Sequence, residues 1–231
     1  MKRFLALMSL ALLLAGPAGA FTESDGWRVA AQAWTFRSST FFETVDTLHQ
    51  LGVRYLEAYP GQPIGGGIEG TTHYAMDEAT RRKLKDKLNE AGVTLVQYGV
   101  VSGKDEADWR NLFAFAKDMG IETITSEPPQ EQLDLVEKLC DEYGVNLAVH
   151  NHPKPSRYWN PNTVFDAVKD RSRRMGICPD TGHYLRSGLD PVAVLNKVGG
   201  RVITVHLKDL AERKPKTHDV IYGTGAGDVH A

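Results

Sequence analysis

Short β-rich runs alternate with amphipathic helical segments along this 231-residue chain, and this alternation restricts the possible folds more than any other feature. Strands are expected over residues 27–36, 53–59, 93–101, 121–127, 146–152, 175–180 and 202–207. Helices are expected between them, one capped by Thr40 and reaching Leu51, and others over 77–91, 106–119, 130–143, 163–169 and 191–198. Four of the helices are followed directly by a glycine, the usual helix stop, at Gly52, Gly92, Gly120 and Gly144. Strands separated by single helices predict βαβ units and a parallel sheet.

The number of β/α steps favours a (β/α)8 barrel over an open nucleotide-binding sheet. An open sheet of that kind needs a glycine fingerprint after its first strand, and Ala33-Trp34-Thr35-Phe36 has none. The loop Gly223-Thr-Gly-Ala-Gly-Asp228 is expected to lead into a seventh helix, and no eighth strand precedes Ala231. We therefore expect an α/β fold, a (β/α)8 TIM barrel with seven β/α strands that is truncated at its C-terminus and lacks the eighth strand.

The first twenty residues have the features of an export signal. Lys2 and Arg3 precede an apolar stretch over 4–15, and Ala18-Gly19-Ala20 has the small-x-small pattern after which signal peptidase cuts. The stretch is short for a membrane span, and a retained amphipathic anchor is the alternative. The expected organisation is a signal peptide over 1–20, cleaved after Ala20, and one barrel domain over 21–231 in an exported, periplasmic protein without membrane association after cleavage.

Charge and cysteine content narrow the classes of function. A formal net charge of −2 predicts no basic surface for nucleic acid or anionic membranes. Cys140 falls on an expected helix and Cys178 in an expected strand, so both are expected to be buried thiols, although export leaves a disulfide open. The absence of a P-loop and of an arginine cluster argues against a phosphorylated substrate. The sequence does not determine the oligomeric state.

Polar side chains occur where four of the expected strands end, at Ser126-Glu127, His150-Asn151-His152, Pro179-Asp180 and His206-Leu207-Lys208-Asp209. A strand that is buried on both faces reads apolar throughout, so these acids and histidines require another explanation. Because side chains alternate along a strand, one register places the site candidates on the inner face, namely Glu57, Glu127, His150, His152, Asp180, His206 and Lys208. The pattern predicts a packed barrel interior with a polar cup above it that can hold a divalent metal ion.

Each of these residues also has a purely structural interpretation. Asp180 could cap the turn at Thr181-Gly182, and Lys208-Asp209 could be an exposed ion pair of little energetic value. Loop, rim or core positions are the structural alternatives for the others, namely Glu127, His150, His152 and His206. A shared register favours a site, because independent structural roles would not place all of these side chains on one rim.

At Asp180-Thr-Gly-His183 and His206-Leu-Lys-Asp209 the sequence resembles the xylose isomerase-like TIM-barrel superfamily, often labelled sugar phosphate isomerase/epimerase. The resemblance runs from about Trp27 to Asp228. Its other motifs are Tyr55-Leu-Glu57-Ala, Ser126-Glu127-Pro128, His150-Asn-His152 and Gly223-Thr-Gly225. Each motif is weak alone, and their order and spacing make the set specific. The chain looks most like exported members from bacteria that degrade complex glycans and glycosides.

The resemblance implies one divalent ion (Mn, Zn, Mg or Co) held by two glutamates, an aspartate and a histidine. Carried onto matching positions, Asp180 and His206 are ligands. Many relatives carry the first glutamate on the fifth strand, where this chain has His150-Asn-His152, so Glu127 on the fourth strand is the expected substitute. The last glutamate belongs on the eighth strand, and without it the site has three ligands and a broken carboxylate pair.

The function that the resemblance implies is that of a metal-dependent sugar isomerase or epimerase, acting on a keto or aldo sugar through an enediolate. Glu127, His150 or His152 would transfer the proton. Lys208 would neutralise the developing oxyanion, and substrate contacts are assigned to Trp34, Glu57 and His183. The expected partner is a small-molecule sugar or glycoside.

Three alternatives remain open at this point. Expulsion of a β-substituent from the enediolate would make the protein a lyase or dehydratase acting on a keto sugar or 3-keto-glycoside. The missing strand favours an inactive or sugar-binding remnant of such a barrel. An endonuclease IV-like nuclease shares the fold, but it needs a larger ligand set and a basic groove, which the net charge does not support.

Overall fold

The computed structural model describes residues 23–24 and 26–230, and a parallel sheet of six strands lies at its centre. The strand order is β10-β9-β8-β7-β4-β3, and each neighbouring pair is parallel. These strands are Ala30–Gln32 (β3), Tyr55–Ala58 (β4), Thr94–Gly99 (β7), Thr123–Ser126 (β8), Asn146–His150 (β9) and Met175–Cys178 (β10). The fold is an α/β barrel that does not close. The predicted signal peptide over 1–20 lies outside the described residues.

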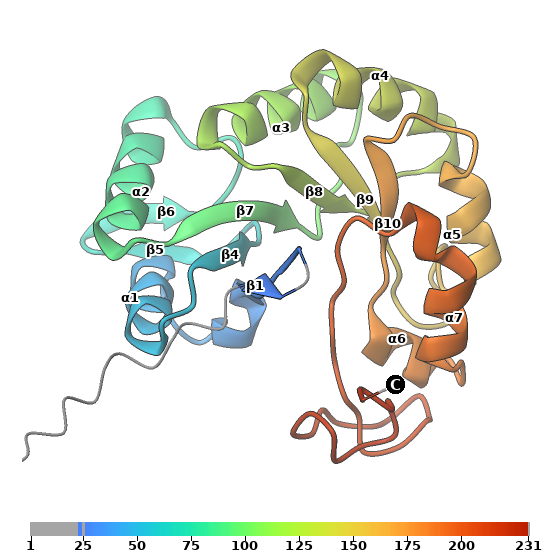
Figure 1. Ribbon diagram of the computed structural model, residues 1–231. Helices are drawn as coiled ribbons and strands as arrows, with labels where there is room; N and C mark the ends of the chain where they lie inside the picture. The colour runs from blue at the N-terminus through green and yellow to red at the C-terminus, as the bar shows by residue number, and fades with distance from the viewer. Residues whose placement is uncertain (1–22, 25, 231) are drawn as a thin grey trace, which may run out of the picture.

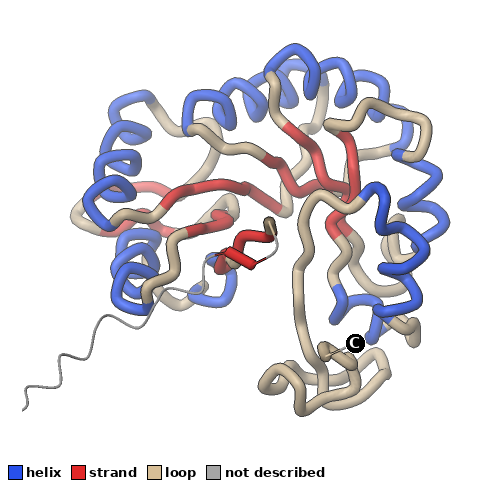
Figure 2. The backbone as a smooth tube through the Cα atoms, viewed as in Figure 1, coloured by secondary structure: helices blue, strands red, loops and turns tan. Residues whose placement is uncertain are grey.

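Helices cover the outer side of the curled sheet in an arc from α1 to α7 (Figures 1 and 2). They are Phe41–Leu51 (α1), Glu78–Ala91 (α2), Glu106–Met119 (α3), Leu133–Tyr143 (α4), Pro161–Val168 (α5), Thr181–Arg186 (α6) and Pro191–Val198 (α7). Single 3-10 turns span Ala33–Phe36 (η1), Gln130–Gln132 (η2) and Gly199–Arg201 (η3). Two small hairpins pair Glu23–Ser24 (β1) with Trp27–Arg28 (β2) and Pro63–Gly65 (β5) with Ile68–Thr71 (β6). Within the described part of the chain, no helix has the length and apolarity that a membrane span requires.

The ends of the helices follow from residues next to them in sequence. Thr40 begins α1 with a capping box, because its hydroxyl accepts the Glu43 N–H while the Glu43 carboxylate accepts the Thr40 N–H. Aspartates at positions 77 and 105 cap α2 and α3 in a similar way. The four predicted glycine stops all adopt the left-handed conformation, with φ of 71°, 63°, 73° and 71° at Gly52, Gly92, Gly120 and Gly144. The predicted α3 bounds of 106–119 are confirmed.

The hydrophobic core lies between the sheet and the helices. The outward-facing strand residues Leu56, Ile124 and Leu147 are fully buried, and the helix residues Leu48 and Leu112 that cover this side of the sheet are equally buried. This burial fixes the alternation of the strands, so the opposite register faces the interior of the barrel. Inside, the Gln97 amide donates to Thr125 Oγ1 across two neighbouring strands at 2.6 Å.

The first expected strand is shorter in the structure than the sequence indicates. Strand β3 ends at Gln32, where the side-chain oxygen of Gln32 accepts the Trp34 N–H and begins η1. The local hydrogen bond therefore competes with further strand pairing, and Trp34 lies on a 3-10 turn.

The segment over 202–207, expected as a seventh strand, does not form a regular strand. It runs beside β10 with two isolated parallel bridges, Ile177 to Val202 and Asp180 to His206. The two bridges are three residues apart on the β10 side, from Ile177 to Asp180, and four residues apart on the other side, from Val202 to His206. The pairing register therefore shifts between them. In addition, Pro179 has no N–H to donate to a ladder. The expected count of seven regular strands is corrected to six, and none of the residues that the structure describes forms an eighth strand after this segment.

Candidate metal centre

Eight polar side chains gather at the carboxyl ends of the strands, and we call them the polar cluster. Its members are Glu57, Glu127, His150, His152, Asp180, His183, His206 and Lys208. They come from β4, from the residues that end or follow β8, β9 and β10, from α6 and from the 202–207 segment with its extension. Every predicted site residue except Trp34 belongs to this cluster.

Asp180 is the centre of the polar cluster and is completely buried. Its Oδ1 accepts the backbone N–H of His183 at 2.9 Å and thereby caps α6. Its Oδ2 accepts a hydrogen bond from Lys208 Nζ at 2.6 Å. The same oxygen lies 3.5 Å from His150 Nε2, 3.6 Å from His183 Nε2 and 3.8 Å from His206 Nδ1. One oxygen of Asp180 therefore caps the turn at Thr181-Gly182, as the structural interpretation of the sequence proposed, and the other oxygen faces three imidazoles.

The surroundings of Asp180 and His183 determine their protonation states. Burial by itself raises the pKa of Asp180, but the hydrogen bond from His150 and the charge of Lys208 outweigh it and hold the pKa far below its usual range. Burial also lowers the pKa of His183 to about 3, although the Asp180 carboxylate opposes this shift. The ionised carboxylate is the form in which Asp180 would coordinate a metal.

Glu57 orients His206 from the other side of the cluster. His206 Nε2 lies 2.6 Å from Glu57 Oε2, although the two residues are 149 positions apart. Burial lowers the pKa of His206, but its contacts with Cys178 and Glu57 outweigh this and raise the pKa well above its ordinary value. A carboxylate that holds one ring nitrogen leaves the other, here Nδ1, to a metal, as in many metal-ligating histidines.

Glu127 forms a separate arm of the cluster with two histidines. Its Oε1 lies 2.5 Å from His152 Nδ1 and 3.1 Å from His150 Nδ1. Burial raises the pKa of Glu127, but the hydrogen bonds to both histidines outweigh it and lower the pKa to about 2. The Tyr158 hydroxyl donates to the Pro128 carbonyl at 2.7 Å, which fixes the backbone beside Glu127. The His152 side chain is 47 % exposed, so this arm reaches the solvent-facing edge of the cluster.

Among the residues that the structure describes, two sets of three ligand atoms lie close enough to hold one ion, with all atoms of a set within 4.8 Å of one another. One set is His150, Asp180 and His206, and the other is Glu127, His150 and His152. The predicted combination of Glu127 with Asp180 and His206 is neither of these, because the His150 ring lies between them. His150 Nδ1 faces Glu127 and its Nε2 faces Asp180, so His150 belongs to both sets.

The residues present fit a divalent cation. Two imidazoles and a carboxylate are common ligands for Zn²⁺ and related ions. Moreover, the buried Glu57 Oε1 has no hydrogen-bond partner among the described residues, next to His206. A buried carboxylate oxygen without a partner is costly unless a ligand satisfies it. The orphaned oxygen marks a further polar site beside His206, and the convergence on Asp180 Oδ2 indicates a cation centre at His150, Asp180 and His206.

Asn151 is a positioning residue that the sequence interpretation missed. Its side chain donates to the Asp180 carbonyl at 3.3 Å and accepts the Asp180 N–H at 2.8 Å. Asn151 is only 1 % exposed, and these two bonds fix the backbone of the central carboxylate. Strand alternation turns Asn151 away from the inward face, so its place between His150 and His152 was the only signal.

Trp34 lies at the rim and interacts with other residues than the polar cluster. Its ring is 55 % exposed and meets Tyr59 edge to face, with ring centroids 5.1 Å apart. The Arg37 guanidinium lies 5.6 Å from the Trp34 ring. Because Tyr59 follows β4 two residues beyond Glu57, this aromatic pair is connected to the cluster through β4.

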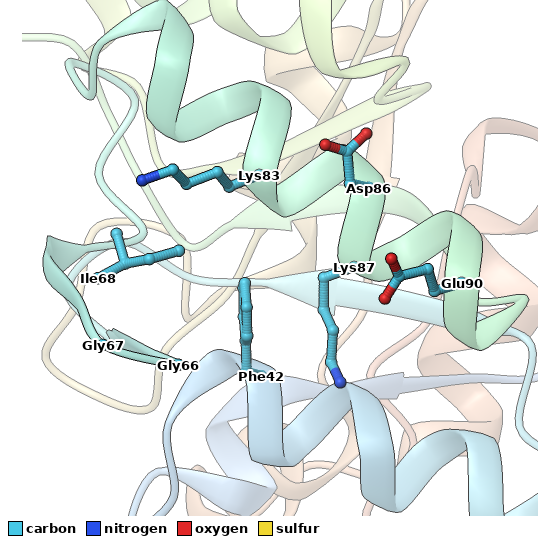
Figure 3. Close-up of a pocket in the computed structure, with 8 residues that line it drawn as sticks. All are labelled: Phe42, Gly66, Gly67, Ile68, Lys83, Asp86, Lys87 and Glu90. Atoms are coloured by element: carbon cyan, nitrogen blue, oxygen red, sulfur yellow. The ribbon is translucent and has the colours of Figure 1, made fainter.

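A groove lies on the protein away from the polar cluster. The groove, of about 330 Å³, lies between α1, the β5–β6 hairpin and α2, and Figure 3 shows the residues that line it. Its lining is Phe42, Gly66, Gly67, Ile68, Lys83, Asp86, Lys87 and Glu90. None of these residues belongs to the polar cluster, and charges of both signs line the groove, so it offers no ligand set for a metal.

Comparisons with known proteins identify, over most of the chain, the same family that the sequence motifs resemble. The family described as xylose isomerase-like TIM barrel matches residues 45–230. Inosose dehydratase from Geobacillus kaustophilus is 24% identical over 206 residues, which cover 86% of this chain and 48% of the dehydratase. The chain therefore spans about half the length of this curated relative.

Solved structures agree with this fold. An uncharacterised protein from Parabacteroides distasonis is 35% identical, with a TM-score of 0.71 over 87% of this chain and 81% of its own. A D-tagatose 3-epimerase-like protein has a TM-score of 0.61 over 78% of this chain and 75% of its own, at 16% identity. The second likeness concerns the fold alone.

Proposed function

The chain belongs to the xylose isomerase-like TIM-barrel family, and from this premise we propose that it is a divalent-metal-dependent sugar isomerase or epimerase. Its substrate would be a keto or aldo sugar, and its reaction the transfer of a proton at the carbon next to the carbonyl. The observation that carries the proposal is the convergence of His150, Asp180 and His206.

Three atoms would hold the ion, namely His150 Nε2, Asp180 Oδ2 and His206 Nδ1. A divalent cation bound there supplies the polarisation of the sugar carbonyl and of the neighbouring hydroxyl. Glu57 keeps the His206 ring in the required orientation through its 2.6 Å contact with Nε2. Asn151 does the same for the Asp180 backbone.

Glu127 and His152 are placed to handle the proton. A carboxyl group with a pKa of about 2 is a weak base, so Glu127 is better suited to orient an imidazole than to accept the proton itself. Its contact with His152 Nδ1 leaves Nε2 of that ring available on the exposed side. We therefore assign the proton transfer to His152 and the orientation of its ring to Glu127.

A lyase reaction is the second candidate. The dehydratase likeness over most of the chain favours it. The same proton abstraction would then be followed by loss of a β-hydroxyl or β-glycosyloxy group, which needs a proton donor near the leaving oxygen. Lys208, which is in contact with Asp180, is the candidate for this role.

Metal content and proton exchange together test the proposal. We expect the purified protein to retain about one equivalent of divalent metal and to exchange the substrate proton with D₂O, which NMR would detect on keto sugars and inososes. Unsaturated products would identify the lyase, and epimers or aldose–ketose pairs the isomerase. Absence of metal and exchange would favour a sugar-binding remnant, and two or three equivalents would favour the nuclease.

Variants connect the metal to the residues. Asp180→Ala and His206→Ala are each expected to abolish metal retention, as measured by elemental analysis. His49→Ala, on the exposed face of α1, is the matched control and should retain the metal. Stoichiometric metal in either cluster variant would contradict the assignment. Export with cleavage after Ala20 is a separate proposal, tested by N-terminal sequencing of the protein recovered from a periplasmic extract.

A further inference from the structure

We propose that the Lys208 ammonium and a divalent cation compete for the Oδ2 atom of Asp180, so that Lys208 sets the cation affinity of the centre. The inference rests on the proposed function, because it requires a cation at His150, Asp180 and His206. It goes further by giving Lys208 a role in cation binding that is separate from contact with substrate.

The two oxygens of Asp180 are not equivalent. Oδ1 is engaged by the His183 N–H at the beginning of α6, so it is committed to the backbone. Oδ2 is the oxygen toward which His150 Nε2 and His206 Nδ1 are directed, at 3.5 and 3.8 Å. Lys208 Nζ lies on this same atom at 2.6 Å. A cation that used the three ligands would therefore need the oxygen that the ammonium already holds.

Repulsion between the two positive charges disfavours simultaneous binding of the ammonium and the divalent ion to Oδ2. Zn²⁺ binds a carboxylate oxygen at about 2 Å, and the ammonium is 2.6 Å from the same oxygen. Asp180 is completely buried, so little solvent is available to screen the repulsion between the two cations. Because the two cations repel each other at so short a separation, we expect the divalent ion to displace the ammonium from Oδ2.

The Lys208 stem is built into the site. Thr181 Oγ1 accepts the Lys208 N–H at 2.8 Å and donates to the Lys208 carbonyl at 2.8 Å. A Cβ at Gly182 would lie 2.9 Å from Lys208 Cβ and 3.0 Å from its Cδ, so glycine leaves the space that the stem fills. The contact with Asp180 is therefore more than a chance surface ion pair.

The head group, in contrast, can leave. The Lys208 side chain is 34 % exposed while Asp180 is fully buried, so the ammonium has access to solvent on the side away from the carboxylate. Because Thr181 and Gly182 fix the beginning of the stem, the displaced ammonium stays near the mouth of the cluster. There it can meet a substrate oxygen that gains negative charge.

Manganese titration of the full chain tests the competition. Lys208→Met and Lys208→Gln keep much of the stem and remove the charge, and both are expected to bind Mn²⁺ more tightly than wild type by at least about tenfold. Electron paramagnetic resonance of free Mn²⁺ or calorimetry gives the dissociation constants. Lys208→Arg keeps the charge and should not tighten binding. Lys104→Met, which removes an exposed lysine outside the cluster, is the matched control and should equal wild type.

The outcomes separate this inference from the function on which it rests. Equal or weaker Mn²⁺ affinity in both uncharged variants, with wild-type binding intact, overturns the competition and leaves the cation centre standing. Absence of Mn²⁺ binding in every protein overturns the centre and the competition together. If Mn²⁺ binds to the uncharged variants and not to wild type, the ammonium excludes the cation completely, and the competition is supported. Circular dichroism of each variant ensures that folded proteins are compared.

Discussion

The strand ladder from β3 to β10 and the segment that follows it, residues 179–230, are held in place by different kinds of contact. In the ladder, five parallel strand pairs share backbone hydrogen bonds, and apolar residues such as Ile124 are fully buried. The later segment is joined to the ladder by one isolated bridge, Ile177 to Val202, and has a second bridge within itself, Asp180 to His206. Figure 1 shows that it contains α6 and α7 and then continues as a long loop to the C-terminus. Here side chains that bind backbone groups replace the ladder.

Asp209 is the clearest example of this second kind of contact. Its carboxylate is 1 % exposed and accepts the N–H groups of Gly223, Gly225 and Gly227, each at 2.9 Å. A Cβ at Gly225 would lie 2.4 Å from Asp209 Oδ1, so the glycine loop can wrap the carboxylate only without side chains. The alternative of an exposed Lys208-Asp209 ion pair is wrong, because Lys208 pairs with Asp180 and Asp209 is buried in the loop.

The polar cluster draws its members from both regions. Glu57, Glu127 and His150 belong to the ladder and its edges, whereas Asp180 and His206 depend on the later segment. Regions with few ladder bonds open locally at lower free energy than the whole protein. The cation centre can therefore be disrupted by events that leave the ladder folded, and the following changes test that difference.

We expect the largest loss of stability from truncation of a core side chain in the ladder. Ile124→Ala should lower the free energy of global unfolding by about 2–5 kcal/mol, because it removes a fully buried strand side chain. Urea unfolding followed by circular dichroism measures it. Leu210→Ala is the matched change in the later segment, where the side chain is equally buried. Its effect on global unfolding should be smaller, and an equal effect would show that the two regions unfold as one unit.

The next effect is local and concerns the Asp209 carboxylate. Asp209→Asn replaces an acceptor oxygen by an NH₂ group and weakens the loop by about 1–3 kcal/mol, the cost of unsatisfied buried hydrogen-bonding groups. Faster hydrogen exchange at Gly223, Gly225 and Gly227 measures this, with little change in global unfolding. Asp219→Asn, at an exposed carboxylate paired with Arg186, is the control. Unchanged hydrogen exchange in Asp209→Asn would show that Asp209 does not hold the loop.

The pH dependence of the same loop sharpens the comparison. Burial raises the pKa of Asp209, but the three glycine N–H groups outweigh it and the pKa lies below its usual value. A carboxyl group with a lowered folded-state pKa stabilises the folded form above its unfolded pKa of about 3.9, and the contribution is lost as pH falls through the folded pKa. Protection of the loop, corrected for intrinsic exchange, should be constant between pH 8 and 5 and decline below about pH 4.

That decline should disappear in Asp209→Asn, which cannot titrate at this position. If wild type and the variant lose protection over the same pH range, a different group controls the loop.

The smallest effect is expected at a surface ion pair beside the ladder. Arg28 and Glu122 approach within 2.5 Å, with side chains 38 % and 49 % exposed. Glu122→Gln should cost no more than about 1 kcal/mol, because solvent screens exposed pairs. A shift above about 2 kcal/mol in urea unfolding would mean that this pair contributes as much as a buried contact.

The sequence by itself determined the features that depend on neighbours along the chain. The capping box at Thr40, the glycine stop at Gly120 and the helix over 106–119 are examples, because propensity and local hydrogen bonds act over a few residues. Period-two alternation also placed Glu127, His150 and Asp180 at the ends of strands. The prediction of a regular strand over 202–207 is wrong, because Pro179 and a register shift interrupt the pairing with the neighbouring chain segment. The pattern within 202–207 does not reveal this interruption.

Only the tertiary structure decided which polar side chains meet. Glu57 and His206 are 149 residues apart, and nothing in either local sequence selects the other as a partner. Likewise, alternation turns Asn151 away from the inner face, and in the folded protein its side chain binds the backbone of Asp180, which follows the neighbouring strand. Sheet curvature is set by all strands together, so distances across the mouth of the barrel arise only when the whole sheet has formed.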